Sequence, residues 1–87
     1  MLLLIVEDCF VARGPGVLVS PRFVADEARE TKGTIAVRLV RPDGTSLDAT
    51  ATVDIAHMRG ALAPWAMYRL HGVTEGDVPP GTAVWTR

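Results

Sequence analysis

The chain has 87 residues, of which 48% are hydrophobic and 22% are charged, and its net charge is −1. This composition is typical of a folded domain and argues against disorder. Nine basic residues against ten acidic ones weigh against a protein that binds nucleic-acid phosphates regardless of sequence, since such binding needs a basic surface. The length predicts that residues 1–87 form a single domain.

The start of the chain does not resemble a targeting or membrane segment. The apolar run of residues 2–6 has no basic region before it, and Glu7 and Asp8 interrupt it. It is too short for the apolar part of a signal peptide and far too short to span a bilayer. The single cysteine, Cys9, has no partner for an internal disulfide, which fits a reducing compartment. We therefore expect a soluble, cytoplasmic protein that does not associate with membranes.

The first 23 residues predict a β-hairpin. The apolar run and the acidic pair are followed by Gly14-Pro15-Gly16 and by a second apolar run at 17–19. Glycine reaches positive φ at little cost and proline fixes φ near a turn value, so this tripeptide favours a chain reversal. The acidic pair is expected partway along the first strand. Residues 23–33, which are rich in charge, are expected to form a solvated connection.

A second hairpin is predicted from residues 34–41 and 46–55. Both segments alternate apolar and polar residues, which puts all apolar side chains of a strand on one face. The clearest alternation is that of the second segment, whose apolar residues are Leu47, Ala49, Ala51, Val53 and Ile55. Pro42-Asp43-Gly44 between the two segments is a turn sequence.

The rest of the chain predicts two more strands. Residues 56–65 are expected to form a wide loop that ends with Trp65, because Gly60 and Pro64 disfavour a helix. Trp65 either caps the open end of the domain or anchors a partner. Residues 66–71 alternate again, 74–81 are rich in turn formers, and 82–87 form a last strand that carries Trp85, which is expected in the core.

These segments predict an all-β fold of about six strands. A single open antiparallel sheet of that size would expose one apolar face and two edges. Closure into a small six-stranded antiparallel β-barrel avoids both, and we expect that architecture.

Both ends of the chain resemble a known domain. Residues 7–23 resemble the opening of the second domain of elongation factor Tu and other translational GTPases, which has an acidic pair, an aromatic, a Gly-x-Gly turn and a strand ending in arginine. The matching residues are Glu7, Asp8, Phe10, Gly14, Gly16 and Arg22. Residues 68–85 resemble the end of that domain, with matches at Leu70, Gly72, Val73, Glu75, Val78 and Gly81. The middle aligns loosely through Val53, Asp54 and Ile55.

The resemblance implies a β-barrel of the translation-factor domain 2 type without its GTPase. The chain contains no G-x-x-x-x-G-K-[ST] loop, so no GTP binding is expected. In the family this barrel helps to hold the aminoacylated 3′ end of tRNA. By position, Glu7, Asp8 and Phe10 correspond to the segment near the amino acid and Asp54 to an acidic residue near the terminal adenine. His57 stands near a basic position of the family, and Trp65 stands about where the family has an asparagine.

Simpler interpretations stand beside these assignments. Glu7 and Asp8 are also what a solvated strand end carries, and adjacent strand residues face opposite ways, so they are poorly placed as an acid–base pair. Cys9 is expected to be a small buried side chain. His57 and His71 lack further ligands at metal spacing, so neither a metal nor a cofactor is expected.

The function predicted from the sequence is that of a non-catalytic binding module with an unidentified protein partner, because no set of residues suggests an enzyme. Its expected surface anchors are Phe10, His57, Trp65 and Arg69. The alternative is an RNA-binding, translation-associated role at the tRNA 3′ end through Glu7, Asp8 and Asp54. Small barrels with an incompletely closed edge often pair, so a homo-oligomer is a further expectation.

Overall fold

Alternation of apolar and polar residues makes most of this chain extended, because a strand then buries one face and solvates the other. The computed structural model describes residues 1–11, 15–24, 33–56 and 65–87, and for residues 21–24, 55, 56 and 65 it describes the backbone alone. The elements in chain order are β1 (Leu2–Ile5), β2 (Asp8–Phe10), β3 (Val17–Val24), β4 (Ile35–Val40), β5 (Ser46–Ala56), β6 (Trp65–His71), a short 3₁₀ helix η1 (Glu75–Asp77) and β7 (Ala83–Thr86).

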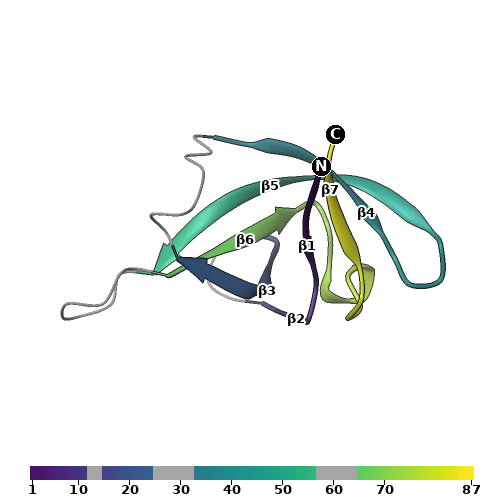
Figure 1. Cartoon of the computed structure of the whole chain (residues 1–87), viewed down its shortest axis with the longest axis horizontal. Coiled ribbons are helices and arrows are strands. Elements are labelled where there is room, and N and C mark those ends of the chain that lie inside the picture. The colour runs from purple at the N-terminus through teal and green to yellow at the C-terminus, as the bar shows by residue number, and fades with distance from the viewer. Residues whose placement is uncertain (12–14, 25–32, 57–64) are drawn as a thin grey trace.

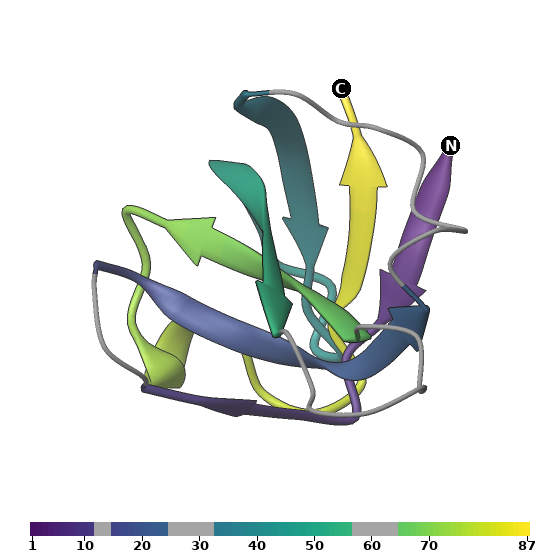
Figure 2. The same cartoon turned by 90° about the vertical axis from the view of Figure 1, so that its left-hand side faces the viewer.

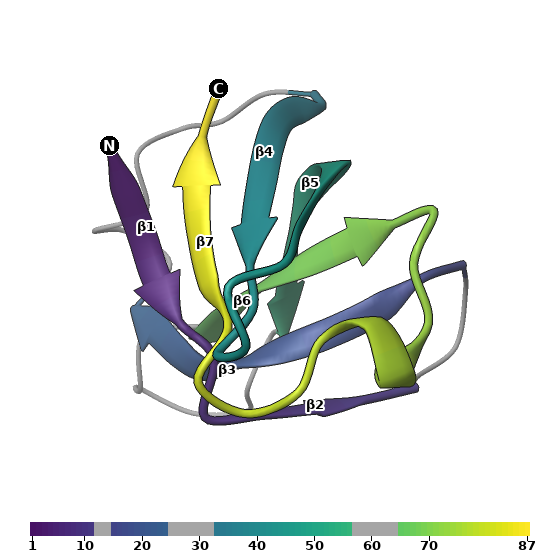
Figure 3. The same ribbon diagram turned by 90° about the vertical axis from the view of Figure 1, so that its right-hand side faces the viewer.

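The seven strands of the described residues form one antiparallel sheet in the order β1-β7-β4-β5-β6-β3-β2. The sheet curls, so that β1, β7 and β4 stand nearly upright in Figure 2 while β6, β3 and β2 cross beneath them. The other two views show the same curl from the side and from the opposite end (Figures 1 and 3). The result is an all-β half-barrel, which confirms the predicted all-β, barrel-like class.

The strand count differs from the prediction of six because the first predicted strand breaks at Val6 and Glu7. The backbone N–H of Val6 donates to the carbonyl oxygen of Thr82, just before β7, at 2.8 Å. The N–H of Glu7 donates instead to the carbonyl oxygen of Ser20 in β3, at 2.9 Å. Consecutive residues therefore bond to opposite ends of the sheet, and Glu7 and Asp8 lie at a corner rather than partway along one strand.

The first predicted hairpin is present as β2 and β3, paired from Asp8 opposite Ser20. Gly14 of its turn lies outside the described residues, but Gly16 is described and has a φ of +76°. A Cβ at Gly16 would overlap the carbonyl oxygen of Leu70 in β6. The absence of a side chain thus lets the end of the turn approach β6 closely.

The second predicted hairpin is confirmed as β4 and β5. Its turn is closed by the N–H of Gly44, which donates to the carbonyl oxygen of Arg41 at 2.9 Å. One carboxylate oxygen of Asp43 accepts from the N–H and the hydroxyl of Thr45 at 2.9 and 2.6 Å. The predicted apolar face is the one that packs inward: Val37, Leu39 and Ala51 are buried, and Ile35, Leu47, Ala49 and Val53 pack partly buried against them.

The core occupies the inner side of the curled sheet. It consists of buried apolar residues from five strands and from the segments beside them, namely Val6, Val17, Val19, Val37, Leu39, Ala51, Tyr68, Leu70, Val73, Val78 and Val84. Val73 and Val78 belong to the segment around η1, where a carboxylate oxygen of Asp77 accepts from the N–H of Thr74 at 2.9 Å. The two valines of this turn pack against the inner side of the sheet.

Both tryptophan predictions need correction. Trp65 is the first residue of β6, with its backbone opposite Val24 and Ala56, and so is not in an irregular loop. Trp85 is 42% exposed instead of lying in the core. It alternates in β7 with Val84, which is fully buried, so Trp85 faces outward.

Candidate functional site

Three of the predicted site residues share one surface of the sheet. Asp8 and Phe10 on β2 and Asp54 on β5 all point away from the core, because their neighbours Cys9 and Val53 pack inward. We call this surface, on strands β2, β3, β6 and β5, the outer face. Its described side chains include Asp8, Phe10, Leu18, Thr52, Asp54, Arg69 and His71.

The strand register gives the spacing of these groups. Leu18 lies opposite both Phe10 and Arg69, and Arg69 lies opposite Thr52. Asp8 and Asp54 are separated by the three spacings from β2 to β5, which amounts to roughly 14 Å at the usual distance between strands. They are too far apart to hold one metal ion or to flank one small substrate. The arrangement suits an extended partner instead.

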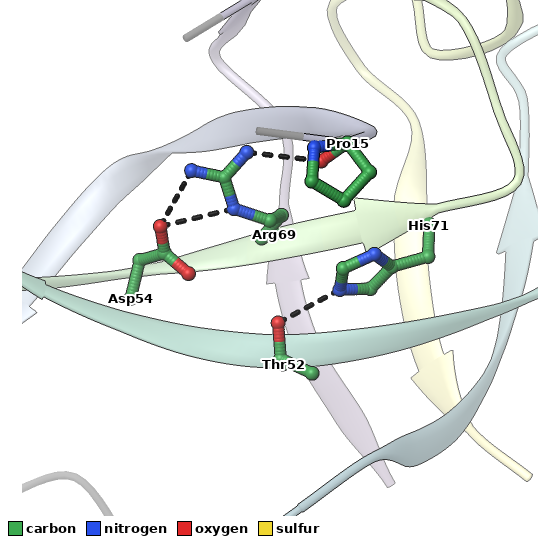
Figure 4. A network of polar contacts seen from close by, with 5 residues as sticks. All are labelled: Pro15, Thr52, Asp54, Arg69 and His71. Carbon is green, nitrogen blue, oxygen red and sulfur yellow. Dashed lines mark hydrogen bonds and ion pairs between the residues drawn. The ribbon is translucent and has the colours of Figure 1, made fainter. Parts of the chain in front are cut away.

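Arg69 lies at the centre of the outer face and is only 8% exposed. Its Nε and Nη2 donate to Oδ2 of Asp54 at 3.0 and 2.6 Å, and its Nη1 donates to the carbonyl oxygen of Pro15 at 2.9 Å (Figure 4). The hydrogen bond to Asp54 raises the pKa of Arg69, against the opposing effect of burial. Arg69 is therefore a fixed structural cation, and its prediction as an exposed anchor is wrong.

Asp54 is fixed by the same contacts but stays accessible. Its side chain is 39% exposed, and both hydrogen bonds from Arg69 go to one of its two carboxylate oxygens. Figure 4 shows the other oxygen turned away from Arg69. Beside it, Oγ1 of Thr52 and Nε2 of His71 are hydrogen-bonded at 2.8 Å (Figure 4). The polar side chains on the outer side of β5 and β6 are thus fixed by hydrogen bonds to one another.

The bend between β1 and β2 carries an acidic corner, formed by Glu7, Asp8 and Glu75. Glu7 and Asp8 are exposed, as is Glu75 at the start of η1. Cys9 points inward between them, and its Sγ donates to the carbonyl oxygen of Val78 at 3.3 Å. Burial raises the pKa of the Cys9 thiol, and the charges of Glu75 and Asp8 raise it further. The two carboxylates therefore act on the same thiol and lie close to it.

Apolar side chains continue from this corner along β2. Phe10 is 39% exposed and Val11, the next residue, is 65% exposed. β2 is also an end of the sheet, with β3 as its neighbour. We call residues 7–11 the β2 edge; it combines two carboxylates, two exposed apolar side chains and a strand with one unpaired side among the described residues.

The two remaining predicted site residues are not placed on this surface. His57 lies outside the described residues. Trp65 is described only in its backbone, at the start of β6.

Basic side chains are absent from the β2 edge in the part of the chain that the structure describes. Arg69 is bound to Asp54, and Arg38 and Arg87 both pair with Asp48, at 3.0 and 3.6 Å, on the outer side of β4 and β5. Among the side chains that the structure describes, the accessible charge of the β2 edge is therefore negative.

A second exposed apolar surface was not predicted. Leu2 lies opposite Trp85 across β1 and β7, and Ile5 lies opposite Ala83. The exposed fractions are 40% for Leu2, 48% for Ile5 and 42% for Trp85. The signal was present in the sequence, because Val84 and Trp85 are adjacent in a strand and only one of them can face the core. We call Leu2, Ile5 and Trp85 the β1 patch.

Other kinds of site found no support. The residues that the structure describes include no group of three or more His, Cys, Asp or Glu placed to hold a metal ion. Within the same residues, no helix has the length and apolar character needed to cross a membrane. Comparisons with protein-family models, with curated proteins and with solved structures found no match.

Proposed function

We propose that this chain is a non-catalytic binding module whose β2 edge takes an extended, basic segment of a protein partner. The observation that carries this proposal is the chemistry of the edge: Glu7 and Asp8 are exposed next to Phe10 and Val11, at one end of the sheet. An end strand presents backbone donors and acceptors to which an extended peptide adds as a further strand.

The side chains of β2 would give such a peptide its specificity. Asp8 and Phe10 point to the outer face, so a partner strand would meet a carboxylate and an aromatic ring at alternate positions. Carboxylates attract lysine and arginine and speed the encounter, while the aromatic ring supplies the apolar contact that holds the complex. Asp54, whose charge is paired with that of Arg69, adds an accessible hydrogen-bond acceptor farther across the sheet.

The resemblance to the second domain of elongation factor Tu supports a binding role. That domain is a β-barrel that binds its ligand by surface contacts, and a curled all-β sheet is compatible with it. We therefore propose a translation-factor domain 2 type of barrel that works without a GTPase domain and without a cofactor.

Binding of the aminoacylated tRNA 3′ end is less well supported than protein binding. Phosphate contacts need accessible lysine or arginine, and the described β2 edge presents none. Asp54 remains a group that accepts hydrogen bonds from a ribose hydroxyl, so RNA binding is treated as an outcome of the test.

The test uses the full chain and a fluorescent peptide of alternating lysine and valine. At low salt, the double variant E7Q/D8N should weaken peptide binding at least fivefold, which corresponds to about 1 kcal/mol. The matched control D43N/D48N removes two charges elsewhere and should leave the affinity within twofold. A glutamate–valine peptide should not bind.

Equal losses in both double variants would show that only the net charge matters and would contradict a site at the β2 edge. A parallel titration with charged and uncharged tRNA separates the RNA alternative. Binding of tRNA that D54N abolishes, with no binding of the lysine peptide, would replace the proposed function by the RNA role.

A further inference from the structure

The other end of the sheet, β1, differs from β2 in its chemistry. Among the described residues, β7 is the strand that pairs with β1, and the opposite side of β1 has no neighbour in the sheet. A β-bulge between Leu2 and Leu4 changes the alternation of the strand, so that Leu2 and Ile5 both face outward while Leu4 packs on the core. All four residues of β1 are apolar.

The charges of the two end strands decide which of them can pair with a second copy of the chain. If β2 paired with β2 of a second copy, the two Glu7 and two Asp8 carboxylates would all lie at one interface, and like charges at such short range repel even when they are not directly opposite. β1 carries no charged side chain, and it lacks the lysine and proline residues that commonly prevent strand-to-strand association at a sheet end. Self-association is thus opposed at β2 and unopposed at β1.

We propose that a second copy of this chain adds to β1, forming a two-fold symmetric dimer with one sheet continuous through both copies. An antiparallel arrangement that sets Leu2 opposite Ile5 of the second copy pairs all four residues of the strand. It also matches the faces, because Leu2 and Ile5 both point outward. The same register brings the β1 patches together, since Trp85 lies beside Leu2 on β7.

The exposed area fits a weak dimer. The exposed fractions of Leu2, Ile5 and Trp85 correspond to roughly 300 Å² of apolar surface per copy, within the usual size of a functional patch. Edge-to-edge pairing covers only the sides of these residues that meet the second copy, because the outer face of the continuous sheet stays open to water, so the contact is small and falls in the size range of weak, transient interfaces. The dimer should therefore form and dissociate readily, with a dissociation constant of about 1–100 μM.

Sedimentation velocity over a range of chain concentrations tests this proposal. The wild-type chain should change from monomer to dimer as the concentration rises through the micromolar range. Ile5→Lys, at an outward position, should keep the circular dichroism spectrum and raise the dissociation constant at least tenfold. Val11→Lys adds the same charge at the β2 edge and should leave the monomer–dimer equilibrium unchanged. A wild-type chain that stays monomeric up to 500 μM, or equal effects of both variants, would overturn the proposal.

The register is tested by cross-linking, in a background where Cys9 is replaced by alanine. Residues opposite each other across two antiparallel strands have Cβ atoms close enough for a disulfide. A mixture of chains carrying Leu2→Cys with chains carrying Ile5→Cys should therefore cross-link under mild oxidation, far faster than either variant alone. Similar rates in the mixture and in the single variants would contradict the register.

The dimer and the proposed function are separable. Ile5→Lys should not change the affinity for the lysine–valine peptide, and E7Q/D8N should not change the dimer. A wild-type chain that binds the peptide but stays monomeric would therefore overturn the dimer alone.

Discussion

Replacement of Gly16 by alanine is the sharpest structural test, because the chain contains its own control. Gly16 has a φ of +76°, and a Cβ built there overlaps the carbonyl oxygen of Leu70 in β6. Gly44, in the turn between β4 and β5, has a similar φ of +90°, but a Cβ there meets no atom within 4 Å. Both substitutions put alanine at a positive φ, which costs the same conformational energy. Only the Cβ at position 16 also collides with another part of the chain.

The backbone cost of alanine at positive φ is about 1–2 kcal/mol, which is the full effect expected for Gly44→Ala. At Gly16 the obstacle is the backbone of a paired strand, which cannot turn away as a flexible side chain would. Overpacking of this kind adds about 1–3 kcal/mol, so Gly16→Ala should lower the free energy of unfolding by about 2–5 kcal/mol. The total free energy of unfolding of a chain of this size is roughly 4–13 kcal/mol, so this variant would lose much of its stability.

Urea unfolding at pH 7, followed by circular dichroism, measures both variants. Gly16→Ala should be less stable than Gly44→Ala by about 2 kcal/mol, or about 10 °C in Tm. Since Pro15 precedes Gly16 and its carbonyl accepts from Arg69, the variant should also disturb the outer face. Equal losses in the two variants would show that β3 does not approach β6 as closely as described.

Three further predictions concern individual side chains. Asp54→Ala should lower the free energy of unfolding by about 1–2 kcal/mol in urea, more than Arg69→Met, because it leaves a buried guanidinium without its carboxylate; the reverse order would contradict the burial of Arg69. Cys9 has a raised thiol pKa, so iodoacetamide should alkylate it more slowly at pH 8 than an unstructured cysteine peptide, with the rate still rising above pH 9. Hydrogen bonds from Thr45 lower the pKa of Asp43 below its usual 3.8, so this carboxylate stabilises the fold above that pH and the effect is lost as the pH falls through the lowered pKa. Asp43→Asn should accordingly reduce the loss of stability on acidification from pH 5 to pH 2, and an unchanged acid profile would refute this.

The alternation of apolar and polar residues and the turn sequences predicted the hairpins, because a hairpin forms between segments that are close in the sequence. The alternation that starts at Leu47 and the turn sequence around Asp43 act within about 20 residues, and they correctly predicted β5 and the turn that joins it to β4. The side-chain period of a strand also put Leu47 and Val53 on the inner face.

The features that were not predicted depend on contacts with residues far away in the sequence. The break at Glu7 exists because its N–H finds Ser20 while the N–H of Val6 finds Thr82, and nothing within the segment indicates this. Arg69 is buried because Asp54 and the carbonyl of Pro15 receive its guanidinium.

Sequence reasoning proposed Asp8, Phe10 and Asp54 as site residues but did not predict that they share one surface. Asp8, Phe10 and Asp54 share the outer face only because β3 and β6 lie between β2 and β5 in the sheet. Trp85 was assigned to the core on size and hydrophobicity, yet strand alternation gives that place to Val84. Whether a large aromatic residue faces outward is decided here by its position in the strand alternation and not by its residue type.

The two ends of the sheet give this chain two different surfaces. In the two proposals, Glu7 and Asp8 would make the β2 edge selective for a basic partner, while the uncharged β1 would pair with a second copy. If both operate, a dimer would display two β2 edges. A partner with two basic segments would then bind more tightly than one with a single segment, through the raised effective concentration at the second edge.

The central claim is that the β2 edge is the surface that binds. Nuclear magnetic resonance on the isotope-labelled chain, titrated with the lysine–valine peptide, tests it residue by residue. The largest changes in backbone amide shifts should fall on Asp8–Phe10, on Val11 and on the facing part of β3. Changes centred on β1, or on Asp48 between Arg38 and Arg87, would contradict the account.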